Sequence, residues 1–301
     1  MKLKNLIAAT FTPMQQDQSL NLDIIKDYGS FLKRNKVTGA FVNGTTANFV
    51  SLSTVERKNV IDAWAKDKPT DLHLINHVGH NNLKEAMELT THSAEKVDAI
   101  AAIAPFYFKI KTVEQLLEYC KKISACAPNV PFYYYHLPIL SGANFKMIDF
   151  IKLATREIPN FSGIKFSEND LIDFKYCLDY KTPKCDLLFG VDEIFLSSLS
   201  LGAQGWVGST YNHLAPLYYE IKEAYYNADH KKAASLQAKA MRFVTLLNDY
   251  KGYNGVAKGF MSVLGVDCGP SRFPHATLSK PDYIKISEML EEEAILQYMC
   301  K

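Results

Sequence analysis

A lysine near the middle of the chain stands in a short strand-like segment, Gly163-Ile164-Lys165-Phe166-Ser167. Because side chains alternate along a strand, Lys165 shares one face with Gly163 and Ser167. Ile164 and Phe166 share the other face, which is apolar and suited to packing against helices. We therefore expect Lys165 to point to the enclosed side, where burial favours the neutral amine that attacks a ketone. The alternative is a strand-end lysine that reaches solvent.

A tyrosine at the end of another such segment is the second candidate, in Pro131-Phe132-Tyr133-Tyr134-Tyr135-His136. Tyr133 and Tyr135 share a face, and Tyr135 ends the segment. Adjacent parallel strands lie about 4.8 Å apart, so pairing of the two segments would place Tyr135 beside Lys165 as a proton carrier. The alternative for these aromatic residues is core packing, which we adopt for Tyr134.

Three further segments end in polar residues that suit a substrate. Gly44-Thr45-Thr46 offers hydroxyl and backbone N–H groups for a carboxylate. Gly190-Val191-Asp192-Glu193 offers two acceptors for a polyhydroxylated molecule, and the last segment ends in Gly208-Ser209-Thr210-Tyr211-Asn212. The structural alternatives are helix capping for the threonines and a favourable helix-dipole contact for the two acids.

Other titratable residues form no competing site in the sequence. His73 and His77 would share a strand face, but His80 falls on the other and no carboxylate completes a set, so we predict no metal ligand. Lys258 lies in a helical pattern and is interpreted as solvated. No C-x-x-C pair is present, which fits scattered thiols in a reducing cytosol; the cysteines are Cys120, Cys126, Cys177, Cys185, Cys268 and Cys300.

These candidates need an architecture that gathers the ends of several strands. Short apolar runs, rich in strand formers or bounded by turn formers, alternate with amphipathic stretches such as residues 83–94, which Asn81-Asn82 would cap. The runs are 6–12, 39–46, 72–79, 99–106, 131–138, 161–167, 186–192 and 205–211. Eight strands alternating with helices predict a (β/α)₈ TIM barrel, whose active site lies at the carboxyl ends of the strands. A doubly wound sheet is the alternative, although no G-x-G-x-x-G follows the first run.

The bulk properties fit one domain of this kind. We expect residues 1–212 to form the barrel core, and residues 213–301 to form the last barrel helix and a C-terminal helical extension of the same domain. The chain has 301 residues, 48% of them hydrophobic, so a large core is available. A net charge of +2 without a dense basic block predicts no nucleic-acid partner and no membrane-surface partner.

The N-terminal segment has a basic start, but its apolar run is short and no small-residue cleavage pattern follows. We therefore interpret it as the first strand. No apolar stretch approaches the roughly 20 residues that span a bilayer. These features predict a cytoplasmic protein that acts on small molecules.

Taken in order, the motifs resemble the pyruvate-dependent class I aldolases, a family that includes dihydrodipicolinate synthase and N-acetylneuraminate lyase. The resemblance covers nearly the whole chain, and Gly190-Val191-Asp192-Glu193 with Ser209 is similar to the sugar-chain pocket of the lyase branch. In the synthase branch an arginine follows the motif proline by two residues, where this chain has Leu140. The segments that carry the resemblance are Gly44-Thr45-Thr46, Tyr135-His136-Leu137-Pro138, Gly163-Ile164-Lys165, Gly208-Ser209-Thr210-Tyr211-Asn212, and Gly269-Pro270 with Arg272.

The resemblance implies a reaction that needs no cofactor. Lys165 would condense with the keto group of sialic acid (N-acetylneuraminate), and Tyr135 would take the proton from the hydroxyl at the bond to be cleaved. Reversible cleavage would then give pyruvate and N-acetylmannosamine. Tyr107 matches a catalytic tyrosine that family members extend into a neighbouring subunit's site, which implies a homo-oligomer, commonly a tetramer. The implied substrate contacts are Thr45 and Thr46 for the carboxylate, and Ser167, Gly190, Asp192, Glu193 and Ser209 for the sugar.

Two departures from the family pattern bear on this expectation. The family usually continues the Thr-Thr pair with Gly-Glu, whereas this chain has Ala47-Asn48-Phe49, which restricts the loop if the position needs a positive φ. Ser167 stands where many lyases carry threonine, and it keeps the hydroxyl.

Two alternatives stay open at this point. One is a related aldolase for another 2-keto acid, such as a 2-keto-3-deoxy sugar acid. The other is a catalytically silent keto-acid-binding paralogue with a regulatory role, which the retention of both Lys165 and Tyr135 disfavours.

Overall fold

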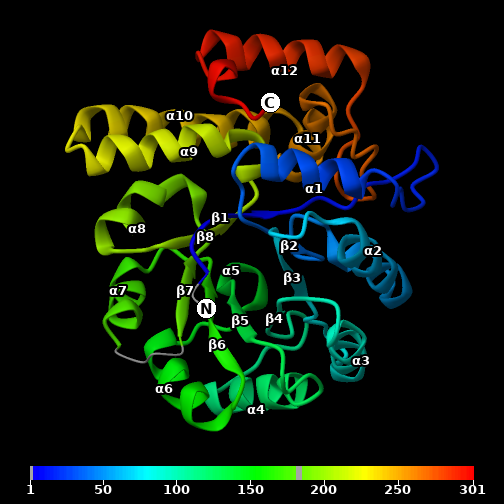
Figure 1. Ribbon diagram of the computed structural model, residues 1–301, viewed down its shortest axis with the longest axis vertical. Helices are drawn as coiled ribbons and strands as arrows, with labels where there is room; N and C mark the ends of the chain where they lie inside the picture. Colours follow the sequence, from blue (N-terminus) through cyan, green and yellow to red (C-terminus); the bar gives the residue numbers. More distant parts are fainter. Residues whose placement is uncertain (1–2, 181–184) are drawn as a thin grey trace.

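Eight parallel strands close into a barrel in the order in which they occur along the chain (Figure 1). The computed structural model describes residues 3–180 and 185–301. The last strand pairs with the first, with Ile7 opposite Val207, so the predicted TIM barrel is confirmed and the doubly wound alternative is wrong. The strands are β1 (Asn5–Ala9), β2 (Gly39–Val42), β3 (His73–His77), β4 (Ala99–Ile103), β5 (Phe132–His136), β6 (Phe161–Phe166), β7 (Asp186–Phe189) and β8 (Gly205–Gly208).

Each strand ends before the end of the apolar run that predicted it. The run 39–46, for example, contains a strand only as far as Val42, and the rest turns away from the sheet. The polar residues at the ends of the runs therefore lie in the loops that follow the strands. This is the rim at which barrel enzymes place their active sites.

Helices connect the strands on the outside of the barrel and continue beyond the last one. The predicted helix at 83–94 is observed as α3 (Leu83–Ser93), and the side chain of Asn82 caps it by accepting a hydrogen bond from the Lys84 N–H. The connecting helices are α1 (Ile25–Arg34), η1 (Phe49–Ser51), α2 (Thr54–Asp67), α3 (Leu83–Ser93), α4 (Val113–Ser124), α5 (Pro138–Ser141), α6 (Met147–Glu157), α7 (Leu171–Asp179), η2 (Asp192–Ile194) and α8 (Phe195–Leu201).

The final segments are also helical and pack on one another. Helices α10, α11 and α12 lie at the top of the view in Figure 1, far from α4 and α6. None of the helices in the described part of the chain has both the length and the apolarity of a membrane span. These segments are α9 (Tyr211–Tyr226), α10 (His230–Lys251), α11 (Tyr253–Phe260), η3 (Met261–Leu264), α12 (Lys280–Glu292) and η4 (Leu296–Tyr298).

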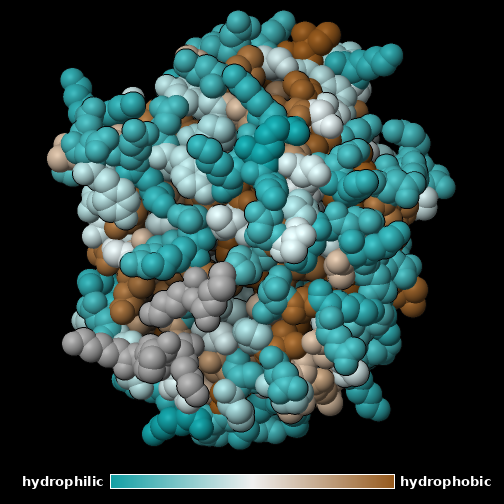
Figure 2. All heavy atoms as spheres, viewed as in Figure 1, coloured by the Kyte–Doolittle hydropathy of each residue, from teal (hydrophilic) through white to brown (hydrophobic). Residues whose placement is uncertain are grey.

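The core consists of two layers that the alternation of strand side chains separates. Ile164 and Phe166 belong to the large cluster between strands and helices, whereas a smaller cluster inside the barrel includes Phe41 and Tyr135. The expected orientation of β6, with its apolar face toward the helices, is therefore confirmed. On the outside of the molecule, hydrophilic side chains dominate the face shown in Figure 2, where apolar residues appear only in small patches.

A buried histidine joins α9 to the C-terminal segments. The His213 Nε2–H donates to the carbonyl oxygen of Ala257 at 2.8 Å, and the Cys300 N–H donates to the carbonyl oxygen of His213 at 2.7 Å. Burial lowers the pKa of His213 from its ordinary 6.5 to about 4. The folded protein therefore holds this imidazole neutral at a pH where an unfolded chain would protonate it.

We predict that this histidine makes stability depend on pH between 6.5 and about 4. Below pH 6.5 the unfolded chain binds a proton that the folded protein does not, so stability falls as the pH falls. Between pH 7 and pH 5 the loss is about 2 kcal/mol for this group. His213→Gln keeps an N–H for Ala257 without titrating, so its urea midpoint should change less over this range. An identical pH dependence in both proteins would contradict the assignment.

Candidate active site

Lys165 lies inside the barrel on β6 and is only 5% exposed. Its Nζ stands over two aromatic rings, 3.8 Å from the ring centre of Tyr135 and 4.3 Å from that of Phe41. Among the described residues, no carboxylate lies within ion-pair distance of this nitrogen. The amine is thus buried beside ring faces, and no anion in the described part of the chain engages it.

Tyr135 is the direct neighbour of Lys165 across the sheet. The two residues are register partners on β5 and β6, as the sequence predicts for adjacent strands. The phenol oxygen of Tyr135 lies 3.2 Å from Oγ1 of Thr45, which comes from the loop after β2. The amine, the phenol and the threonine hydroxyl therefore meet at one place although they come from three separate segments.

The loop after β2 presents two unused backbone donors. The N–H groups of Ala47 and Asn48 donate back to Gly44 and Thr45, which folds residues 44–48 into a tight turn. In the described part of the chain, the N–H groups of Thr45 and Thr46 donate to no protein acceptor. Adjacent free N–H groups in such a turn, with two hydroxyls beside them, form an anion-binding concavity.

The departure at Ala47 does not strain this loop. The positive φ lies one residue later, at Asn48 (φ 51°, ψ 47°), and asparagine is one of the few residues that tolerate this conformation. The carbonyl of Ala47 accepts a hydrogen bond from Thr12 Oγ1 at 3.0 Å. The missing glycine therefore leaves the turn and its free donors intact.

Asp192, which follows β7, stabilises the neighbouring loop after β8. One oxygen of Asp192 accepts hydrogen bonds from the N–H of Thr210 at 3.0 Å and from its hydroxyl at 2.7 Å. The other oxygen lies so close to Gly208 that a Cβ there would stand 1.8 Å away, so this position requires glycine. Burial raises the pKa of Asp192, and the hydrogen bonds from Thr210 oppose that effect.

Two further predicted residues have polar groups that remain available. The hydroxyl of Ser167 is buried and has no partner among the described residues. It fits there because Gly190 has no side chain, since a Cβ at this position would lie 2.2 Å from the Ser167 Oγ. Glu193 is half-buried, and its pKa is raised by burial and by the adjacent charge of Asp192.

A cavity of about 440 Å³ opens beside these acids. Its wall includes Tyr253, whose phenol oxygen accepts a hydrogen bond from Ser209 Oγ at 3.0 Å. Sequence reasoning missed this contribution from α10 and α11, because scattered polar residues on a long helix are typical of a solvated face. The lining residues are Asp192, Glu193, Ser209, Thr210, Val244, Thr245, Asn248, Asp249 and Tyr253.

A buried arginine and a buried histidine lie behind the site, and no pattern in the sequence predicts the arginine. Arg57, on α2, is fully buried and donates to the carbonyl oxygens of His77 and Gly79. His77 accepts a hydrogen bond from the Ile103 N–H and has Asn43 O 2.8 Å from its Nδ1, which assigns the neutral Nδ1–H form. Burial and the Arg57 charge hold the pKa of His77 well below its usual range.

The interpretation of Lys258 as solvated is wrong. Its side chain is 7% exposed, and its Nζ donates to the carbonyl oxygen of Pro270 at 2.6 Å. Burial lowers the pKa of Lys258 to about 8. The segment 269–275 covers α11 here, and a helical pattern alone does not reveal such a cover.

Tyr107 lies apart from the other predicted residues. It follows β4 and is 75% exposed, next to Phe108 at 83%. A second, largely apolar cavity of about 510 Å³ opens beside Thr45 and is lined by Thr45, Asn48, Phe49, Val50, Ile103, Phe106, Leu140, Asn254, Pro274 and His275. Within one subunit, therefore, Tyr107 does not complete the group around Lys165.

Comparisons with known proteins give a consistent result. The profile of the dihydrodipicolinate synthetase family matches residues 2–293. N-acetylneuraminate lyase from Rattus norvegicus is 40% identical over 278 residues, which are 91% of this chain and 87% of the rat protein. The solved N-acetylneuraminate lyase from Proteus mirabilis is 36% identical with a TM-score of 0.94, over 98% of this chain and all of the other. That from Aliivibrio salmonicida is 34% identical with the same TM-score, over 99% of each chain.

Proposed function

The chain belongs to the dihydrodipicolinate synthetase family, and on this premise we propose that it is a class I aldolase that cleaves N-acetylneuraminate reversibly to N-acetylmannosamine and pyruvate. The observation that carries the proposal is the Lys165 amine, which is buried beside Tyr135 and is engaged by no anion of residues 3–180 and 185–301. We infer the substrate from the relatives named above, which are N-acetylneuraminate lyases.

The chemistry begins with an imine. The Lys165 amine adds to the keto carbon C2 of the open-chain sugar acid, and water leaves as Tyr135 gives its proton to the departing hydroxyl. The protonated imine then accepts the electrons of the C3–C4 bond, while the Tyr135 phenolate takes the proton of the C4 hydroxyl. N-acetylmannosamine leaves as the aldehyde, and protonation and hydrolysis of the remaining enamine release pyruvate.

The loop after β2 suits the carboxylate of such a substrate. The free N–H groups of Thr45 and Thr46 and their hydroxyls supply donors, and Thr45 also contacts the Tyr135 phenol. The turn is complete without the family glycine, which disfavours a silent paralogue. Leu140, which stands where the synthase branch has arginine, lines the apolar cavity and offers no cation for a second carboxylate.

The polyol chain of the sugar acid would occupy the cavity beside β7 and β8. Among the described residues, neither the Ser167 hydroxyl nor the Glu193 carboxylate has a protein partner, and Ser209 lies at the cavity wall. Gly190 has no side chain and so leaves space beside the Ser167 hydroxyl, and Asp192 holds Thr210 in place through hydrogen bonds. A cavity of about 440 Å³ favours a long polyol over a shorter 2-keto sugar acid.

We also infer a homo-oligomer, a tetramer by analogy with the family, in which Tyr107 enters the site of a neighbour. Tyr107 and Phe108 are exposed in the loop after β4, and Ile139 is exposed on α5. The two segments are adjacent, since Lys109 donates to the carbonyl oxygen of Leu140. Large exposed apolar side chains on adjacent segments indicate a contact surface. The apolar cavity beside Thr45 has room for an aromatic ring. A cytoplasmic location fits the six cysteines, which include no C-x-x-C pair.

Borohydride trapping is the experiment that tests the activity. After incubation with N-acetylneuraminate and borohydride, mass spectrometry should find a pyruvate-derived adduct on Lys165, since imine formation and cleavage both precede reduction. Lys258, which is also buried, should stay unlabelled and serves as an internal control. Lys165→Met should give neither adduct nor turnover.

Other outcomes of the trapping experiment would overturn the proposal. An adduct with the mass of the whole sugar acid would indicate binding without cleavage. No adduct in folded protein, or an adduct only with 2-keto-3-deoxy sugar acids, would reject N-acetylneuraminate as the substrate.

A neighbouring pair of tyrosines allows a matched test of the proton carrier. Tyr135→Phe should lower kcat by about 10²- to 10⁴-fold, because the phenol oxygen would no longer move the proton. Tyr134→Phe is the control, since Tyr134 lies in the outer layer and its hydroxyl has no partner among the described residues. Equal effects of the two substitutions on steady-state kinetics would refute a specific role for Tyr135.

Mixing of two impaired variants tests the proposed role of Tyr107. Tyr107→Phe should lower kcat by about tenfold or more, and Lys165→Met should abolish it. Refolding the two variants together should restore activity, because a subunit with Lys165 would receive Tyr107 from its neighbour. A monomer in light scattering, or no gain on mixing, would show that Tyr107 does not act between subunits.

A further inference from the structure

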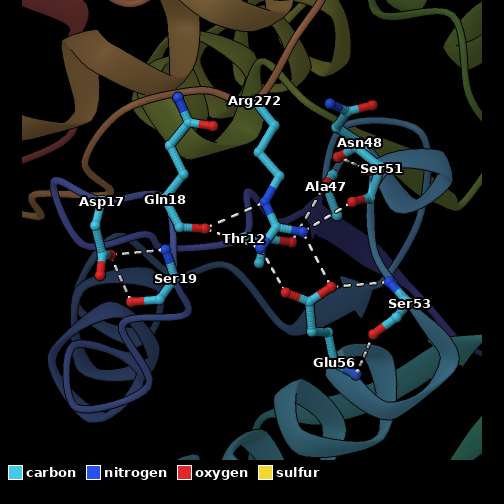
Figure 3. A network of polar contacts seen from close by, with 10 residues as sticks. All are labelled: Thr12, Asp17, Gln18, Ser19, Ala47, Asn48, Ser51, Ser53, Glu56 and Arg272. Atoms are coloured by element: carbon cyan, nitrogen blue, oxygen red, sulfur yellow. Dashed lines mark hydrogen bonds and ion pairs between the residues drawn. The ribbon is translucent and has the colours of Figure 1, made fainter.

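Arg272 joins three segments that are far apart in the chain (Figure 3). Its guanidinium donates to the carbonyl oxygen of Gln18, with distances of 3.2 Å from Nε and 2.8 Å from Nη2. It also donates to the carbonyl oxygen of Ser51 at 2.8 Å and to both carboxylate oxygens of Glu56. These contacts link the segment after α11 to the loop after β1 and to the loop that leads into α2.

The five contacts use every N–H that an arginine has. Arg272 therefore has no donor left for a substrate carboxylate. Its side chain is 20% exposed and that of Glu56 is 25% exposed, so the pair is mostly shielded from water. Any effect of Arg272 on the site must therefore pass through the segments to which it donates, which include the backbone at Gln18 and Ser51.

Glu56 ties this contact to the start of α2. It is the third residue of the helix and accepts a hydrogen bond from the Ser53 N–H at 2.8 Å, completing a capping box. The hydrogen bonds from Arg272 are the main reason that the pKa of Glu56 falls to about 2. The pair is therefore charged at neutral pH.

The loop that carries Thr45 and Thr46 ends at the residue that Arg272 holds. Ser51 donates to the carbonyl oxygen of Asn48 through both its N–H and its hydroxyl, and Asn48 is the residue with positive φ. On the opposite side, Thr12 fixes the carbonyl of Ala47. Without Arg272, the turn would keep its connection to β2 and its hydrogen bond from Thr12. It would lose the hydrogen bond from Arg272 to the carbonyl oxygen of Ser51.

We propose that Arg272, paired with Glu56, is a positioning residue that holds the turn at 44–51 so that the N–H groups of Thr45 and Thr46 face the substrate carboxylate. This inference rests on the proposed function. It assigns Arg272 an effect on one part of the substrate only. Pyruvate carries the carboxylate, whereas N-acetylmannosamine does not.

The two products therefore allow a selective test. Arg272→Lys keeps the charge but loses the fork of donors, and Glu56→Gln keeps the acceptor for Ser53 but loses the ion pair. Each should raise the KM for N-acetylneuraminate and the inhibition constant of pyruvate by about tenfold. The inhibition constant of N-acetylmannosamine should stay within about twofold of the wild-type value.

Two controls separate positioning from general loosening. Arg242→Lys alters another arginine–glutamate pair, Arg242 with Glu293 on the outer surface, and should change none of these constants. The double variant Arg272→Lys/Glu56→Gln should be no worse than either single variant, because both break the same contact. Additive effects, or equal rises for both products, would overturn the inference.

Trapping of pyruvate on Lys165 in the wild-type protein keeps this test independent of the proposed function. An adduct in the wild type together with unchanged pyruvate constants in both variants would overturn the role of Arg272 alone. Absence of the adduct would instead reject the aldolase activity.

Discussion

Closure of the sheet is the constraint on which the rest of the structure depends. Because β8 pairs with β1, eight strands have no free edge, and all their carboxyl ends face one rim. Period-two alternation then assigns every second side chain to the interior. These two rules bring Lys165, Tyr135, Thr45 and Asp192 into one small volume although as many as 147 residues separate them in the chain.

The interior of the barrel places apolar and polar surroundings close together. Aromatic rings lie beside the Lys165 amine, whereas the threonine turn and the Asp192 carboxylate are rich in donors and acceptors. A buried amine costs stability, as functional groups commonly do. The extensive outer layer between strands and helices offsets that cost without contacting a substrate.

Local pattern was enough to predict the strands and the inward face of β6, because both depend on the spacing of apolar residues. It was also enough to predict that Lys165 and Tyr135 lie side by side, because they stand at the ends of neighbouring runs. It was not enough for Arg57, Lys258 and Arg272. A charged residue in a helix or loop is usually solvated, and only the folded chain shows that distant carbonyl groups surround these three. The positive φ at Asn48 likewise depends on the whole turn.

Pairing of the first strand with the last has a consequence for synthesis on the ribosome. Leu6 pairs with Trp206, so one edge of β1 stays unpaired until β8, at Gly205–Gly208, has been made. Exposed strand edges associate readily with other chains. The nascent barrel therefore has a long interval in which it is open to aggregation, and chaperones that shield apolar segments would matter most before β8 emerges.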